Sequence, residues 1–575
     1  ILNRNVESHF ATLPRANIER STFDTSCNIK TSFNCGDLIP FGLWEILPGD
    51  SWDVTTSKVI RSQTMLTPLF GDLMVDTYFF FVPSRLCWNH WREFCGENTE
   101  SAWAPEIEYA MPTIASPEGG FAINTIADYL GLPIGVEWNA DDELAPMALP
   151  FRGYALIAQE FFRDENLTDP LLIPLDDAHQ QGSNGSNYIT DVANGGKPFR
   201  VAKYHSYETS ALPAPQKGAA VGIPIDVPLF SGGVFPVTTT ADFSWPSSGV
   251  PMAVSRLKAG NVTDKDNLPT LETQYQSLNF ITSDNVANQT SWANNTNVTS
   301  YVPANLAVNI PSDTPGGTVT AEFSVNELRL AFAFQRFLER LALSGSRYTE
   351  ILLGLFDVRS PDARLQRPEY LGGNRVPINV TEVTNVAQSD QDYLGDVAAK
   401  SQTNDRHHDF VKSFTEHGFV FGLMCIRYEH SYSQGIHKMW TRKKFTDFYN
   451  PKFAHLGEMP IYQAELCATS DNMQTRNDIF GYQEAWAEYR YGRNMVTSEM
   501  RPGVPNSLSY WNLSDYYEEP PYLSDEWIRE SPENLDRVLA VSHNVANQFW
   551  ADILVSAKVT RPMPMYSVPG LIDHF

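Results

Sequence analysis

The chain has 575 residues and carries 68 acidic against 42 basic side chains, which gives a formal net charge of −26 at pH 7. Such a surface repels nucleic acid over most of its area, so any contact with DNA would need a local basic patch or a separate basic partner. Hydrophobic residues make up 42% of the chain and charged residues 19%, a composition that excludes a disordered protein. No apolar run reaches roughly 18 residues, so no transmembrane helix is expected.

The first third of the chain contains one clear strand pattern and two weaker helical ones. Residues 1–24, which include Arg4, show little periodicity and predict an extended N-terminal arm. Residues 73–82 are apolar at successive positions, which predicts a strand buried on both faces. Helices are expected near residues 85–97 and 150–163.

Residues 226–320 differ in composition from their surroundings. They are rich in Asn, Thr, Ser, Pro and Gly, and they carry few charges. A loop of this length without structure of its own is uncommon in a compact protein. We therefore expect an inserted, β-rich subdomain that is exposed on one face.

A helix is predicted directly after this segment, over residues 324–345. Ser324 and Glu327 have the spacing of a capping box, and Gly345 can end the helix. Leu328 and Phe332 begin an apolar repeat at helical spacing that continues through the next turns.

Two strands and an extended tail are predicted in the last third of the chain. Residues 418–426 are apolar throughout, and residues 551–560 alternate as a half-buried strand does. Residues 561–575 contain three prolines, which fix φ and remove backbone donors, so this tail must be extended. A tail without a core of its own is expected to lie on another surface.

Motifs of the common catalytic and phosphate-binding sites are absent. The sequence has no P-loop, no G-x-G, no G-x-S-x-G and no H-E-x-x-H pattern, so we predict no catalytic, cofactor-binding or metal-binding residue. The run of His407, His408 and Asp409 could bind a metal, but adjacent residues rarely converge on one ion, and charged neighbours favour a solvated loop. The six cysteines lack a C-x-x-C pair and are expected to be free thiols.

The densest basic stretch of this acidic chain lies at residues 440–445, with an aromatic residue at each end. Cations that neutralise phosphate together with aromatic rings that stack on bases are typical of single-stranded DNA binding. The residues predicted to contact nucleic acid are Trp440, Arg442, Lys443, Lys444 and Phe445, with Arg4 from the N-terminal arm. The alternative interpretation is an exposed helix start or a contact between subunits.

Several long segments of the sequence resemble the major capsid protein of the Microviridae, specifically that of the gokushovirus subfamily. The segments that carry the resemblance are residues 20–24, 47–50, 67–83, 85–88, 209–218, 347–351, 360–373, 480–491 and 569–575. They follow one another in the expected order from about residue 20 to the last residue. The departure is at residues 226–320, where no family sequence is recognised and where the family varies most.

The resemblance implies a structural protein and not an enzyme. The implied fold is mainly β, an eight-stranded antiparallel jelly roll of the viral capsid type, with large insertions that contain helices and a β-rich protruding subdomain. The implied assembly is a T=1 shell of sixty copies around a circular single-stranded DNA genome. Implied partners are a small basic DNA-packaging protein, a pilot or minor virion protein and a receptor on the bacterial host surface. The virion would be assembled in the host cytoplasm.

The resemblance and the sequence patterns together divide the chain into five parts. These are an N-terminal arm (1–24), a first jelly-roll part with helical insertions (25–225), a variable insertion that forms a threefold surface protrusion used for host attachment (226–320), a second jelly-roll part with helices (321–560) and a C-terminal tail (561–575). The candidates for contacts between subunits are the N-terminal arm and the tail, the latter with Arg561, Pro562, Tyr566, Pro569 and Phe575.

The alternative function is a secreted all-β protein that binds or hydrolyses polysaccharide. The acidity, the 13 tryptophans and the richness in loops allow this interpretation. A signal peptide and a pair of carboxylates in a strand context would favour it, and the sequence shows neither. A bacterial surface-layer protein is a third possibility. Electron microscopy of the purified protein separates the three, as closed shells, monomers or flat sheets.

Overall fold

The structure is a computed structural model, and it describes residues 18–71, 73–98, 109–219, 221, 234–236, 252–257, 277–282, 307–309, 325–345, 347–386, 395, 397–468 and 475–567. The chain divides into two compact units, residues 1–220 with 335–575 and residues 221–334, and each is described by itself. Three residues with predicted roles, Arg4, Pro569 and Phe575, lie outside the described residues. The same holds for the capping residue Ser324 and for most of the predicted insertion.

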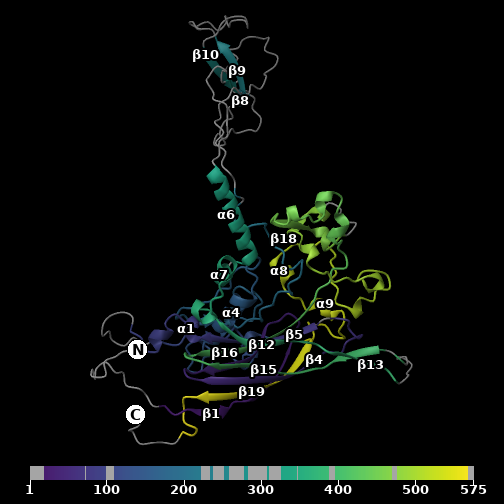
Figure 1. Ribbon diagram of the computed structural model, residues 1–575. Coiled ribbons are helices and arrows are strands. Elements are labelled where there is room, and N and C mark those ends of the chain that lie inside the picture. The colour runs from purple at the N-terminus through teal and green to yellow at the C-terminus, as the bar shows by residue number, and fades with distance from the viewer. Residues whose placement is uncertain are drawn as a thin grey trace. The chain divides into compact units, whose positions relative to one another are not determined.

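The first sheet of the larger unit brings together strands from both ends of the chain (Figure 1). Its members are β1 (Ser21–Asp24), β2 (Cys27–Phe33), β4 (Ser51–Ser62), β15 (Thr403–Ser413) and β19 (Phe549–Arg561). The strands β1 and β2 pair with successive parts of β19, β19 pairs with β4, and β4 pairs with β15. All of these pairings are antiparallel.

The second sheet lies against the first and has the strand order β12-β5-β16-β3. Its members are β3 (Ile39–Ile46), β5 (Leu73–Pro83), β12 (Glu369–Pro377) and β16 (Gly418–Tyr428). These pairings are also antiparallel, with small register shifts in the β12–β5 and β16–β3 ladders. The fold of the larger unit is therefore mainly β and built from antiparallel sheets.

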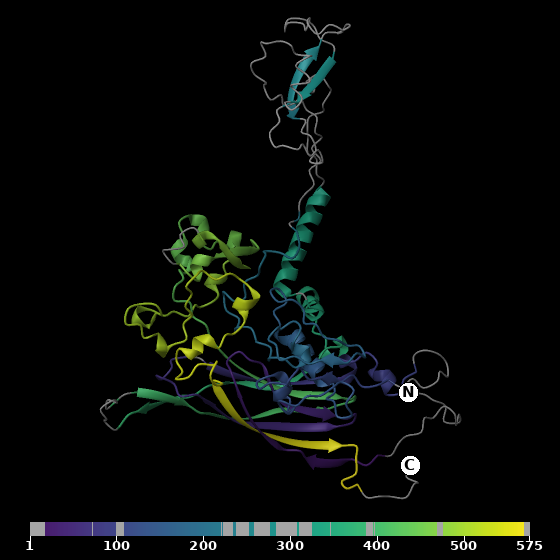
Figure 2. The ribbon, with the colours of Figure 1, turned by 180° about the vertical axis from the view of Figure 1, so that it is seen from behind.

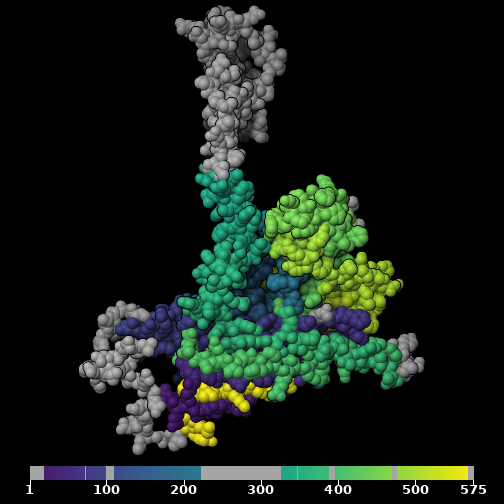
Figure 3. All heavy atoms as spheres, in the orientation of Figure 1, coloured from purple at the N-terminus to yellow at the C-terminus, as the bar shows by residue number. Residues whose placement is uncertain are grey.

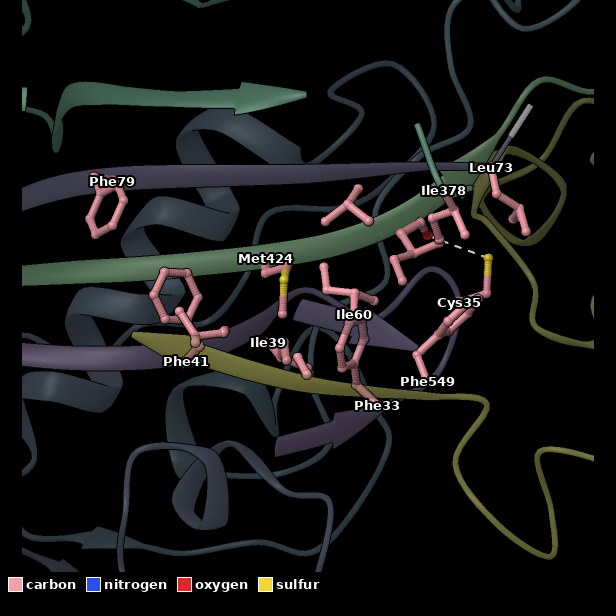
Figure 4. Close-up of a cluster of buried hydrophobic side chains, with 14 of the residues drawn as sticks. Phe33, Cys35, Ile39, Phe41, Ile60, Leu73, Phe79, Ile378, Met424 and Phe549 are labelled. Atoms are coloured by element: carbon pink, nitrogen blue, oxygen red, sulfur yellow. Dashed lines mark hydrogen bonds between the residues drawn. The ribbon is translucent and has the colours of Figure 1, made fainter. Parts of the chain in front are cut away.

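The main hydrophobic core fills the space between the two sheets (Figure 4). The side chains of Phe41, Phe79 and Met424 from the second sheet meet those of Ile60 and Phe549 from the first, and all five are buried. The alternation predicted for residues 551–560 is confirmed, because every second side chain of β19 points into this core. Burial of one apolar face therefore sets the register of β19.

A second core lies on the opposite face of the second sheet. The side chains of Phe80 and Val82 on β5 point into it, while those of Phe79 and Phe81 point into the first core. The prediction that residues 73–82 form a strand buried on both sides is therefore confirmed. The strand β16, at the predicted residues 418–426, is likewise buried on both faces.

Helices cover this second core, on the side of the second sheet that faces away from β19 (Figure 2). They are α1 (Ser84–Cys87), α2 (Trp91–Phe94), α3 (Ile126–Tyr129) and α4 (Leu149–Ile157), the last continuing into the π-helical turn η2 (Ala158–Phe162). The helices expected near residues 85–97 and 150–163 are therefore confirmed. Short connections here are β6 (Ile114–Ala115), β7 (Gln180–Gln181), which pairs with β6 in parallel, and η3 (Val192–Asn194).

Residues 429–468 and 475–548 form a lobe on the same side of the larger unit as these helices (Figures 1 and 3). Its regular elements are β17 (Glu458–Tyr462), β18 (Ile479–Glu484), α8 (Asp525–Ile528), α9 (Glu533–Asp536) and the 3-10 turns η6 (Lys438–Thr441), η7 (Phe445–Asp447), η8 (Pro451–Phe453), η9 (Gln463–Glu465), η10 (Thr475–Asn477), η11 (Ala487–Tyr489), η12 (Ser498–Met500) and η13 (Ser509–Trp511). Its small core includes Ile461, Phe480 and Trp527.

The predicted helix after the insertion is confirmed as α6 (Val325–Ser344), and Gly345 follows it with a φ of +98°. The elements between it and β15 are α7 (Tyr348–Phe356), η5 (Asp362–Leu365) and the hairpin strands β13 (Val380–Thr384) and β14 (Val397–Ser401). No helix in the described ranges is long and apolar enough to cross a bilayer. In the smaller unit, the described strands β8 (Val234–Pro236), β9 (Met252–Leu257), β10 (Ser277–Thr282) and β11 (Ala307–Asn309) form two antiparallel pairs, β8–β11 and β9–β10.

The prediction of a solvated loop at His407, His408 and Asp409 is wrong, because these residues lie within β15. The carboxylate of Asp409 is buried and accepts hydrogen bonds from the backbone N–H of Thr56 at 3.0 Å and from its Oγ1 at 2.8 Å. Polar side chains occupy both faces of this strand, so the sequence shows no apolar alternation. All six cysteines are free thiols, as expected.

Candidate interaction surfaces

The predicted DNA-contact loop lies in the lobe and consists of the two short turns η6 and η7. The side chain of Trp440 is 71% exposed and that of Phe445 is 78% exposed. The carboxylate of Asp447 accepts hydrogen bonds from the backbone N–H groups of Lys443 and Lys444, each at 2.8 Å. These bonds hold the pKa of Asp447 below its ordinary value and fix the turn that presents both lysines to solvent.

Arg442 is the member of this loop that the fold already uses. Its side chain is 10% exposed and forms an ion pair with Glu488 at 2.9 Å. Its guanidinium also lies over the ring of Tyr489, at 4.3 Å from the ring centre. Arg442 therefore ties the loop to η11, and the exposed cations of the loop are Lys443 and Lys444. The contact with DNA stays a prediction.

The C-terminal candidates separate into an anchored residue and an exposed one. Arg561, the last residue of β19, forms an ion pair with Asp50 at 3.2 Å and donates a hydrogen bond to the carbonyl oxygen of Glu45 at 2.8 Å. Its guanidinium lies over the ring of Trp52, at 5.5 Å from the ring centre. Pro562 is half-buried, whereas Tyr566 is exposed. The described part of the tail beyond Arg561 therefore offers Tyr566 to a partner.

The helices α6 and α7 carry an apolar surface that sequence reasoning missed. In the larger unit, the exposed large apolar side chains on them and just beyond are Phe337, Leu343, Tyr348, Leu353, Phe356 and Val358. An exposed apolar surface of this extent marks an interaction site. The signal was present in the sequence, because apolar residues two apart, such as Leu341 and Leu343, cannot share one helical stripe. We call these six side chains the α6–α7 apolar surface.

A buried ionic cluster joins the lobe to the end of β16. His430 is 4% exposed and lies between two carboxylates, that of Asp515 at 2.8 Å from Nδ1 and that of Glu530 at 3.1 Å from Nε2. The ammonium of Lys203 lies 4.0 Å from Asp515. Burial by itself would lower the pKa of His430, but the two carboxylates outweigh it and raise the pKa to about 9.

This cluster is structural, since its charged groups pair with one another and are closed to solvent, although Oε1 of Glu530 is buried without a hydrogen-bond partner among the described residues. Asp515 also accepts a hydrogen bond from the hydroxyl of Tyr517 at 3.2 Å, and its pKa is lowered by the charge of His430 despite burial. Within the described residues, no group of three or more His, Cys, Asp or Glu side chains could hold a metal ion.

Comparison with known proteins points to one family. The phage family described as "Capsid protein (F protein)" matches residues 11–571. The chain is 35% identical over 577 residues to capsid protein VP1 of Spiroplasma virus 4, and the aligned region covers 99% of this chain and 98% of the relative. It is 34% identical to capsid protein VP1 of Chlamydia phage 1, covering 98% of each chain. It is also 34% identical to capsid protein VP1 of Bdellovibrio phage phiMH2K, covering 100% of this chain and 99% of the relative.

Proposed function

Since the chain belongs to the phage capsid protein (F protein) family, we propose that sixty copies form a T=1 shell around a circular single-stranded DNA genome. The protein is a structural protein of a gokushovirus virion and not an enzyme. The observation that carries this proposal is the match to capsid proteins over nearly the whole length of the chain. Family membership sets aside the polysaccharide-binding enzyme and the surface-layer protein. Assembly of many copies into a shell follows from the family; the sixty copies and the host cytoplasm as the place of assembly are part of the proposal.

The arrangement of the strands supports an eight-stranded jelly roll as the shell-forming body. The first sheet contains β2, β4, β15 and β19, with the short β1 as a fifth strand that extends the pairing of β2 along β19, and the second sheet contains β3, β5, β12 and β16. Two facing antiparallel sheets of this kind, with long connections between them, are typical of viral capsid jelly rolls. The long connections are the segment between β5 and β12, which contains the insertion, and the lobe between β16 and β19.

We further propose that residues 226–320 form a protrusion at the threefold axes and attach the virion to its host. The compact unit of residues 221–334 and the strands described within it support a separately folded insertion. The α6–α7 apolar surface supports contact between neighbouring copies, because so many exposed apolar side chains need cover in the assembled particle. The receptor on the host surface is the partner proposed for this insertion.

Deleting residues 230–318 and joining the ends with a short glycine-serine linker should leave particle formation intact and abolish adsorption to host cells. Both sheets lie outside the deleted segment, so the shell-forming body keeps its core. Electron microscopy measures the particles, and a cell-sedimentation assay measures adsorption. Full-length particles treated in parallel are the control, and normal adsorption by the shortened particles would contradict the attachment role.

Deleting residues 562–575 should block particle formation while the chain still folds. The cut leaves Arg561 in place, so its ion pair with Asp50 and the whole of β19 remain. Electron microscopy of the purified protein is the test: closed shells are expected for the full-length chain and none for the shortened one. Circular dichroism of both proteins is the folding control, and normal shells from the shortened chain would refute a role for the tail.

The remaining partners are a small basic DNA-packaging protein and a pilot or minor virion protein. The net charge of −26 supports a basic partner, because an acidic shell cannot neutralise a genome alone. Lys443, Lys444, Trp440 and Phe445 remain proposed DNA contacts, with Arg442 holding their loop in place.

A further inference from the structure

The first sheet presents one face to the main core and leaves its other face open. We call the latter the outer face of the first sheet. Its side chains come from every second residue of each strand, such as Lys30 on β2, Trp550 on β19, Arg61 on β4 and Arg406 on β15. The helices and the lobe lie on the far side of the second sheet, and no described element packs on the outer face (Figures 1 and 2).

The charge on the outer face differs from that of the chain as a whole. Its formal charges are four basic residues (Lys30, Arg61, Arg406 and Lys558) and three acidic ones (Asp24, Asp53 and Asp552). In the whole chain acidic residues outnumber basic ones by 68 to 42. The open face is thus locally non-acidic on a protein that otherwise repels polyanions.

Two of these four cations have acidic neighbours on a facing strand, and two have none. Lys30 lies 3.9 Å from Asp552, and Lys558 stands opposite both Asp24 and Asp53 in the strand register. By contrast, the guanidinium groups of Arg61 and Arg406 have no hydrogen bond or ion pair with any described residue. Both side chains are exposed and therefore available to a ligand.

A hollow of about 410 Å³ opens on this face beside Arg406. It is lined by Asn28, Ser57, Lys58, Val59, Asn404, Asp405, Arg406, Asp552 and Leu554. The lining combines amide and hydroxyl groups with two apolar side chains, which suits the edge and the face of a nucleobase. The carboxylates of Asp405 and Asp552 are already paired, with Lys58 at 3.2 Å and Lys30 at 3.9 Å.

An exposed aromatic ring lies further along the same strand. Trp550 stands directly opposite Arg61 in the β19–β4 ladder, and both side chains are on the outer face. Leu554, which lines the hollow, is four residues along β19, so roughly 13 Å separates the two positions. The pair of Arg61 and Trp550 and the hollow beside Arg406 therefore follow one another in the direction of β19, although Arg61 lies on β4 and Arg406 on β15.

We infer that the outer face of the first sheet binds single-stranded nucleic acid. Arg61 and Arg406 contact phosphates, a base stacks on Trp550, and another base enters the hollow. The inference rests on the proposed shell around a single-stranded DNA genome and names the surface that faces it. Residues 440–445 lie in the lobe, on the far side of the second sheet, so in this orientation their loop faces away from the genome, and the two surfaces are alternative DNA contacts. A second copy of this chain fits the face less well, because the centres of protein interfaces are apolar and poor in charge.

The test compares two double variants of the full-length chain, purified before assembly. Arg61→Gln with Arg406→Gln removes the two unpaired cations. Arg359→Gln with Arg364→Gln is the matched control, since both of these arginines are exposed in the larger unit and belong to no strand of the first sheet. Binding of a fluorescein-labelled oligothymidylate of about 20 nucleotides is measured by anisotropy at several salt concentrations.

Arg61→Gln with Arg406→Gln should weaken binding of the oligonucleotide at least tenfold. It should also reduce the slope of log K against log salt concentration by roughly 1.4, the change expected when two phosphate contacts to a single strand are lost. The control should keep the wild-type affinity and slope. Trp550→Ala should weaken binding about fivefold or more and leave the salt slope unchanged, because stacking releases no counterions.

Equal binding by the two double variants would overturn the inference, as would absence of binding by the wild-type chain. If Arg61→Gln with Arg406→Gln instead stops shells from forming and leaves oligonucleotide affinity unchanged, the face belongs to a contact between copies, and the inference fails. Failure of the proposed function looks different, because the wild-type chain would then form no closed shells in the electron microscope.

Discussion

Replacing His430 with alanine should lower the free energy of unfolding of the chain by about 3–5 kcal/mol. The imidazolium lies between the carboxylates of Asp515 and Glu530 and is closed to solvent. Its removal leaves two buried carboxylates with Lys203, at 4.0 Å from Asp515, as the remaining cation of the cluster. Urea denaturation followed by tryptophan fluorescence measures the change.

The effect of this substitution should depend on pH in a direction that follows from the pKa of His430. The folded protein raises this pKa from 6.5 to about 9, so binding of the proton stabilises the folded state. The bound proton adds on the order of 3 kcal/mol to the free energy of unfolding. This stabilisation is complete below pH 6.5 and is lost as the pH rises through 9. The difference in stability between wild type and His430→Ala should therefore narrow between pH 6.5 and pH 9.

His455 provides the matched control for this experiment. It lies in the same lobe, but its side chain is exposed. His455→Ala should change the free energy of unfolding by less than about 0.5 kcal/mol and leave the pH dependence as in the wild type. A constant difference between wild type and His430→Ala from pH 6 to pH 9 would contradict the assignment of a charged imidazole to this cluster.

Making the α6–α7 apolar surface polar should stop particle formation without unfolding the chain. The variant Leu343→Gln with Phe356→Gln changes two exposed side chains, of which Phe356 is 69% exposed. Neither belongs to a core, so the free energy of unfolding should change by less than about 1 kcal/mol. In the shell, however, both lie where we propose that neighbouring copies cover the helices, and the yield of particles should fall at least tenfold.

The control for this variant is Leu144→Gln, which changes an exposed leucine in a loop that belongs to neither helix. It introduces the same polar group and should form particles at the wild-type yield. Particle yield is measured by sucrose-gradient sedimentation and electron microscopy. Shells of normal yield from Leu343→Gln with Phe356→Gln would show that this apolar surface does not mediate assembly.

Local periodicity was enough to predict the elements that carry the cores. The continuous apolar run at residues 73–82 became β5, which is buried on both faces, and the alternation at residues 551–560 became β19. The helix predicted over residues 324–345 became α6. The two strand predictions were correct because each pattern depends on which side chains of the strand are buried, and that pattern can be read from neighbouring residues. The apolar repeat of α6 predicted the helix but not its burial, since the side chain of Phe332 is exposed.

Local patterns failed where the polar residues of a strand find their partners inside the fold. The segment that contains His407 and Asp409 has no apolar alternation, yet it forms β15, because the ladder with β4 and the bond from Thr56 to Asp409 stabilise it. The basic run at residues 440–445 predicts three available cations between two aromatic rings. The fold uses one of them, Arg442, to bind Glu488, which lies 46 residues further along the chain.

The sequence by itself determined the family, the principal strands and helices, and an acidic chain without a recognisable catalytic motif. These follow from segment identity, periodicity and composition, all of which are readable along the chain. The tertiary structure decided which charged groups are free and which are paired: it buried His430 between Asp515 and Glu530, and it left Arg61 and Arg406 open on the outer face of the first sheet. The physical reason is that pairing and burial depend on distances between residues far apart in the chain, and folding alone sets those distances.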